Sequence, residues 1–298
     1  MNESFVINPR IKVINCKQFE VSFNEEETIE NKEYLKKNSH IQIVDLAGYN
    51  NLEELLIVIK KQISNLKITE SQLHESAMLK KLKTIPILAT IFSLPQPIWE
   101  NYTLEEHIIG VKNTIGVLAP NKSNPKLWTM ATILHDIGKA VAVYFENNIT
   151  KGQKKQKSYN LTIAKVILAT LNFNHVDSLY ILTLIDKSYL PYQYVIGDID
   201  YNNLQNELKT LTARLNEAGH QTSALELLTD LKTFWIADGS DYGVIKCLLK
   251  GLPLKPSFCH QFIFVFELKN HQWQFCDVRL KSSWRVKYEE LVQKLQQE

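Results

Sequence analysis

ATILHDIGK, residues 131–139, sets two polar side chains into an apolar helical pattern. The first four residues predict a buried helix, and His135 and Asp136 then stand side by side. Burial of either group without a partner costs several kcal/mol, so each needs a hydrogen-bonding group, a counter-charge or a metal ion. Neighbouring side chains on a helix point about 100° apart, so these two share a target only where the helix ends or bends. Gly138 favours such an end.

Two distant residues extend this pattern toward a metal site. His107 lies at an expected helix start, and Asp238 lies near the end of the apolar run 234–237. Imidazole and carboxylate groups together suit a borderline first-row divalent ion. The residues therefore predict a site in which ligands from three segments converge.

Each of these residues also has a structural interpretation. His135 and Asp136 can form a buried polar pair, and His107 can be a surface residue. Asp238 can belong to a turn before Gly239, in which case Asp241 is the second candidate for the ligand.

The order of these motifs resembles the HD superfamily of metal-dependent phosphohydrolases, in its HDIG form. The resemblance covers roughly residues 99–250. It implies a helical fold for this part and one divalent ion, either Mn, Fe, Co, Ni, Zn or Mg, held by His107, His135, Asp136 and Asp238. Lys139 is placed to meet a phosphoryl oxygen as a point charge, which makes it a catalytic and substrate-binding candidate.

Departures from the family pattern bear on the number of metal ions and on the identity of the general acid. Two-metal members carry further histidines between the HD pair and the final aspartate, whereas residues 157–160 and 185–188 contain none here. One ion is therefore expected rather than two. Lys139 stands where nucleotide-acting members often place a carboxylate, so a general acid must come from elsewhere, and Asp186 is the candidate. No GYP-type signature is present, and cyclic dinucleotide hydrolysis is not proposed.

Composition sets the outer bounds. The 298 residues allow one large domain or two small ones, and 45% hydrophobic residues are ample for a core. A net charge of +2 gives no global electrostatic case for nucleic acid or a membrane surface. The four cysteines are widely spread, which favours a reducing compartment. With no signal-peptide pattern and no long apolar run, we expect a cytoplasmic protein; secretion by a non-classical signal stays open.

The pattern along the chain predicts a mainly α fold with a smaller α/β part built from N-terminal strands and a C-terminal β-hairpin. Residues 1–97 are expected to form an N-terminal α/β domain that ends at Pro95-Gln96-Pro97, with strands in 5–7, 11–14, 19–23 and 41–46 and helices over 51–66 and 70–83.

Residues 98–250 are expected to form the HD-type helical domain. Helices are predicted over 103–118, 126–139, 161–171, 178–185, 203–216 and 223–237, and the lysine-rich segment 146–157 is predicted to be a mobile loop. Residues 251–298 predict a hairpin of strands 262–268 and 272–278 followed by a helix, packed on the N-terminal strands in one sheet.

Three functions from different classes follow. The first is a phosphohydrolase that cleaves a phosphomonoester or phosphodiester, on a nucleotide-like small molecule, by a metal-bound hydroxide. The second is a degenerate HD domain that binds a nucleotide or another ligand without turnover. The third is a protein-interaction role carried by the terminal additions. Nucleic acid is a weaker candidate partner, suggested only by the lysines of 151–157, and the sequence does not fix the oligomeric state.

Overall fold

A computed structural model gives the fold and describes residues 10–22, 46, 48–66, 75–94, 103–121, 124–241, 244–250 and 261–297. The chain is mainly helical, with a small antiparallel sheet, as the sequence predicts. Both expected domain boundaries lie outside the described residues, as do the expected strand at 5–7 and most of that at 41–46. No helix within the described ranges is long and apolar enough to cross a membrane.

The sheet joins the two ends of the described chain. Its strands, in the order β1-β2-β3-β4, are β1 (Arg10–Asn15), β2 (Gln18–Ser22), β3 (Phe262–Lys269) and β4 (Gln272–Leu280). β2 pairs with β3, placing Val21 opposite Phe264, so the hairpin does join the N-terminal strands. Asn270 and His271 both have positive φ, which gives the β3–β4 turn the twist that a two-residue hairpin needs.

Helices make up most of the remaining structure. Those before the HDIG stretch are α2 (Leu52–Ser64), α3 (Glu75–Leu82), α4 (Pro86–Ser93), α5 (Leu104–Leu118) and α6 (Pro125–Leu134). Those after it are α7 (Lys139–Glu146), α8 (Ile149–Thr170), α9 (His175–Lys187), α10 (Leu190–Ile196), α11 (Tyr201–Ala218), α12 (Ala224–Asp241), α13 (Val244–Lys250) and α14 (Ser282–Gln296).

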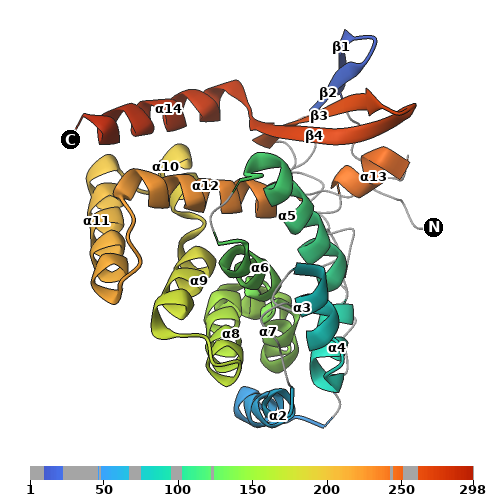
Figure 1. Cartoon of the computed structure of the whole chain (residues 1–298), viewed down its shortest axis with the longest axis vertical. Coiled ribbons are helices and arrows are strands. Elements are labelled where there is room, and N and C mark those ends of the chain that lie inside the picture. The colour runs from blue at the N-terminus through green and yellow to red at the C-terminus, as the bar shows by residue number, and fades with distance from the viewer. Residues whose placement is uncertain are drawn as a thin grey trace.

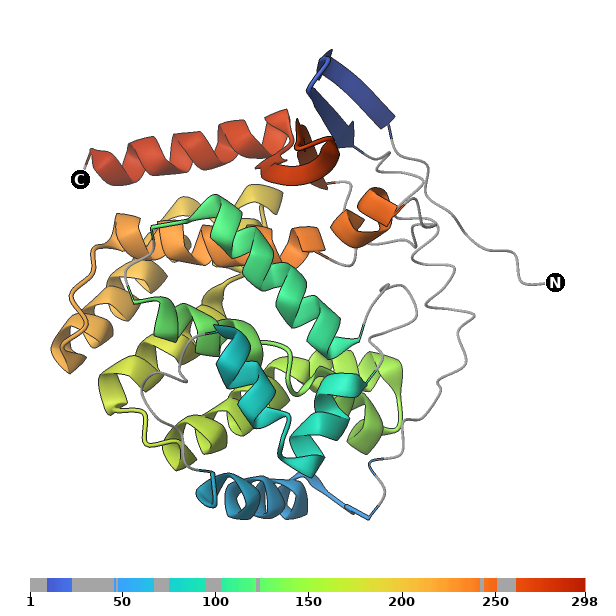
Figure 2. The same cartoon turned by 45° about the vertical axis from the view of Figure 1, so that its right-hand side comes forward.

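The sheet and α14 lie at one end of the molecule and α2 at the other (Figure 1), and a turned view shows the same separation (Figure 2). An aromatic cluster joins the sheet end to the helices. Trp235 of α12 stacks on Trp284 of α14 with ring centroids 6.2 Å apart, and it lies 6.4 Å from Phe262 of β3. Tyr192 of α10 meets both tryptophans. Buried aromatic pairs of this kind stabilise packing beyond their area alone, and here they fix α12 under the sheet.

Two predictions along the helical part are wrong. The expected helix 126–139 ends at Leu134, residues 135–138 form a turn, and α7 begins at Lys139. The expected loop 146–157 is mostly the first half of α8, which begins after Asn148. The Asn148 side chain accepts a hydrogen bond from the Lys151 backbone and so satisfies a donor that the first turn leaves open. The lysines of this segment are therefore on a helix rather than on a flap.

Candidate metal centre

Three helices bring the His/Asp cluster together, a name used here for His107, His135, Asp136 and Asp238. His107 lies in the second turn of α5, a helix that a reciprocal Thr103–Glu106 capping box starts. His135 and Asp136 lie in the turn after α6, and Asp238 lies within α12. Packing of α5 against both α6 and α12 makes these residues converge in space.

The turn at residues 135–138 lets two adjacent side chains face the same site. Because α6 ends there, His135 and Asp136 are no longer bound to the angular spacing of a continuous helix. Gly138 closes the turn against α8, and its backbone N–H donates to Asn160 Oδ1 at 2.7 Å. A Cβ at position 138 would lie 2.5 Å from the backbone of both Tyr159 and Asn160. Only glycine allows the two chain segments to approach this closely.

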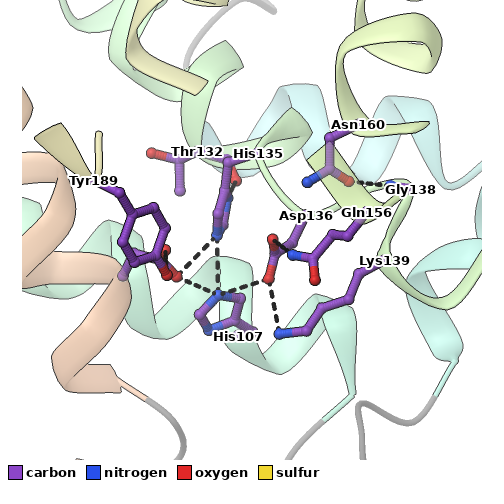
Figure 3. Close-up of polar contacts among 10 residues, drawn as sticks. His107, Thr132, His135, Asp136, Gly138, Lys139, Gln156, Asn160 and Tyr189 are labelled. Atoms are coloured by element: carbon purple, nitrogen blue, oxygen red, sulfur yellow. Dashed lines mark hydrogen bonds and ion pairs between the residues drawn. The ribbon is translucent and has the colours of Figure 1, made fainter. Parts of the chain in front are cut away.

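The donor atoms of the His/Asp cluster converge on one point (Figure 3). His107 Nε2 lies 2.9 Å from His135 Nε2 and 3.0 Å from Asp238 Oδ1, and His135 Nε2 lies 3.3 Å from the same oxygen. Asp136 Oδ2 lies 3.7 Å from His107 Nε2. One ligand atom from each residue falls within 4.8 Å of all the others, and all four residues are buried. This group can hold a metal ion.

Surrounding groups orient the donors. His135 Nδ1 lies 2.7 Å from the Thr132 carbonyl, which can only accept, so Nδ1 carries a proton and Nε2 is the ring nitrogen that faces the cluster. Gln156 of α8 donates to Asp136 Oδ1 at 2.9 Å. The Tyr189 hydroxyl donates to Asp238 Oδ2 at 3.3 Å. Outer contacts of this kind fix ligand orientation in metal sites.

Both carboxyl groups are ionised at neutral pH. Burial alone would raise the pKa of Asp136, but the Lys139 ammonium and then the His135 ring outweigh it and hold that pKa below its ordinary value. Burial also opposes ionisation of Asp238, and His135 and His107 together lower its pKa well below the ordinary range. A cation therefore meets two carboxylates without first displacing their protons.

Of the six predicted site residues, the structure brings five together. Lys139 lies at the edge of the cluster, only 8% exposed, with its Nζ 3.1 Å from Asp136 Oδ2. Asp186, on α9, instead forms ion pairs with Lys157 at 2.8 Å and Lys187 at 3.4 Å. Asp238 lies inside α12 rather than in a turn, and the side chain of Asp241 lies outside what the structure describes.

Three residues of the site were not predicted: Gln156, Asn160 and Tyr189. Gln156 was assigned to a loop, and nothing about a glutamine in a lysine-rich segment indicates a buried contact. Asn160 is buried in the structure and stands between Tyr159 and Leu161 in the sequence. A polar residue within a partly apolar run was therefore the signal that could have indicated its contact. Tyr189 gives no such signal, because its ring is 44% exposed and only its hydroxyl reaches the cluster.

Comparisons with known proteins found no similar protein. A scan against models of protein families gives no match, and searches of curated proteins and of solved structures give none either.

Proposed function

We propose that this protein is a metal-dependent phosphohydrolase of the HD type, acting on a small phosphorylated, nucleotide-like molecule. The observation that carries the proposal is the convergence of two imidazoles and two carboxylates in one buried group, in the chain order of the HD motif. The HDIG turn, which lets adjacent residues serve one site, supports it further.

The residues present fit a single divalent ion. His107, His135, Asp136 and Asp238 would hold it, and mixed nitrogen and oxygen donors suit a first-row ion. With both imidazoles bound to the ion as neutral ligands, the two carboxylates and the Lys139 ammonium would leave one negative charge in excess among the described groups. Such an ion would lower the pKa of bound water and neutralise charge on phosphoryl oxygens.

The chain's own groups then hold and orient the substrate. Lys139 offers its ammonium to a phosphoryl oxygen next to the ligand Asp136. Gln156 and Tyr189 keep the two carboxylates in place, and burial of the cluster excludes bulk water, which strengthens every charge interaction there.

Elemental analysis of wild-type protein and the Asp238→Asn variant tests this proposal. The substitution keeps the shape of the side chain and removes its charge. Wild-type protein is expected to bind about one equivalent of Mn²⁺ and to release phosphate or a nucleotide from a panel of phosphomonoesters and phosphodiesters. Asp238→Asn is expected to lose about 100-fold or more in Mn²⁺ affinity, because it removes a ligand rather than an outer contact.

Glu217→Gln is the matched control, since Glu217 is exposed on α11. Equal metal content in wild type and Asp238→Asn would refute the metal site. Metal binding without turnover on any substrate would refute hydrolysis and leave the second candidate, a ligand-binding module.

One observation favours that second candidate. The Asp186 carboxylate, the expected general acid, is held by two lysines. Across the described residues, the ion pairs of this carboxylate are with lysines of α8 and α9 and not with the His/Asp cluster. Asp186→Asn separates the two functions: retained metal with lost turnover supports a catalytic role for Asp186, whereas unchanged turnover assigns Asp186 to structure.

A further inference from the structure

A second site lies on another face of α12, away from the His/Asp cluster. A cavity of about 700 Å³ opens between α12, α14 and β4, and we name it the α12–α14 cavity. Its α12 wall consists of Thr229, Lys232, Thr233 and Ile236, which fall on one face of the helix. Figures 1 and 2 show α14 running over α12, with β4 leading into it. This volume lies within the range of small-molecule sites.

Part of the cavity wall is apolar. Leu118 of α5, Ile236 of α12, Leu280 of β4 and Val292 of α14 all line it. Such a wall gains free energy by covering the hydrocarbon part of a ligand.

Most charges around the cavity are neutralised within the chain. Arg279 Nε lies 2.7 Å from Asp277 Oδ2, and its Nη1 lies 3.4 Å from Glu20 Oε1. Arg285 Nε lies 3.6 Å from Glu289 Oε1. Each of these two arginines therefore has at least one carboxylate partner.

Lys232 is different. Across the described part of the chain, no carboxylate lies within ion-pair distance of its Nζ, and its contact there is the ring of Tyr288, 4.3 Å from the ring centroid. Burial lowers the pKa of this ammonium, and the more distant Glu289 offsets that effect only in part. A partly buried cation without an ion-pair partner among the described residues is costly to keep, and it is the group that an anion would stabilise.

We propose that the α12–α14 cavity binds a small organic carboxylate with an apolar body. The carboxylate meets Lys232 Nζ, and the hydrocarbon part lies on Leu118, Ile236 and Val292. A cation without an ion-pair partner among the described residues, beside the apolar side chains of the same cavity, calls for an anionic group on a molecule with an apolar body. The proposal does not depend on the function of the His/Asp cluster.

Calorimetric titration of the full chain with sodium octanoate tests the proposal, with 1-octanol as a probe of the apolar part alone and inorganic phosphate as a probe of the anion alone. Octanoate is expected to bind wild type more tightly than either probe. Lys232→Met keeps the length of the stem and removes the charge, and it is expected to lower octanoate affinity about tenfold or more without changing octanol binding. Lys165→Met, at an exposed lysine of α8, is expected to match wild type.

Val292→Trp gives a second readout, because it fills the cavity while Lys232 stays. It is expected to abolish octanoate binding in a protein that still melts cooperatively. Octanoate binding that survives both Lys232→Met and Val292→Trp would overturn the proposal. So would phosphate binding as tight as octanoate binding, or no binding of octanoate to wild type.

Discussion

The His/Asp cluster and the α12–α14 cavity use the same helix, yet they handle charge in opposite ways. The cluster surrounds its carboxylates with Lys139, two imidazoles and two outer hydrogen-bond donors, and all its donor atoms lie within 4.8 Å. The cavity leaves Lys232 facing an aromatic ring and open space. The first site gathers two carboxylates in a closed group, whereas the second places one cation without an ion-pair partner among the described residues beside a hollow.

The difference teaches what each site requires. A closed group of nitrogen and oxygen donors could hold a small cation such as a metal ion. In an open cavity with apolar walls, the missing partner is larger and negative. Charge balance together with the shape of the space thus separates two kinds of ligand on one helix.

The largest effect is expected from a substitution in the turn at residues 135–138, which holds the His/Asp cluster together. Gly138→Ala would place a Cβ 2.5 Å from the backbone of Tyr159 and Asn160, and backbone on both sides cannot yield as a flexible side chain can. We expect a loss of about 3 kcal/mol or more in the free energy of unfolding, with loss of metal binding, while the cavity side is affected only through global stability. Urea unfolding and metal analysis measure both effects.

Gly116→Ala is the control for this experiment. Gly116 lies within α5, and a Cβ there meets nothing within 4 Å. Alanine is expected to stabilise the helix by about 0.5–1 kcal/mol. If both variants behave alike, the close approach at Gly138 does not hold the turn.

A smaller effect is expected from an outer contact of the cluster. Gln156→Leu removes the amide that donates to Asp136 Oδ1. Mn²⁺ affinity is expected to fall about tenfold, because the carboxylate loses its orientation but not its charge. Calorimetry measures this, with Gln153→Leu on the same helix as the control. An unchanged affinity would show that Lys139 and the turn suffice to orient Asp136.

The smallest expected effect is on thermal stability and concerns Lys232 of the α12–α14 cavity. Burial lowers the pKa of Lys232, so the folded state disfavours the charged form and Lys232→Met is expected to raise the melting temperature by about 1–3 °C at neutral pH. As pH rises toward the ordinary lysine value of 10.5, the folded protein releases this proton before the unfolded chain does. The cost in wild type then disappears, and the difference in melting temperature should narrow.

Scanning calorimetry across this pH range measures the difference. A lower melting temperature for Lys232→Met at neutral pH would mean that the contact with Tyr288 outweighs the cost of burying the charge.

The helical core, the antiparallel sheet and the meeting of the cluster residues could be predicted from the sequence because each has a pattern. Histidine and aspartate within an apolar run need partners, and the aromatic and β-branched run in 262–268 predicts a strand. The ligand roles, the metal and the activity stay predictions.

The start of α8 was missed because lysines and polar residues resemble a solvated loop. Its helix is stabilised by packing against α7, where a Cβ at Gly152 would lie 2.6 Å from the Cα of Val143. Such close tertiary contacts leave no mark in local composition, and neither does the contact from Tyr189 to Asp238.

The stripe Gly152, Gln156 and Asn160 has a practical consequence. These residues recur every fourth position along α8, and each meets α7 or the HDIG turn. The exposed lysines 151, 154, 155 and 157 occupy the rest of that helical surface. The outer face of α8 can therefore be substituted, for labelling or surface attachment. Its inner face, which carries Gly152, Gln156 and Asn160, tolerates almost no substitution.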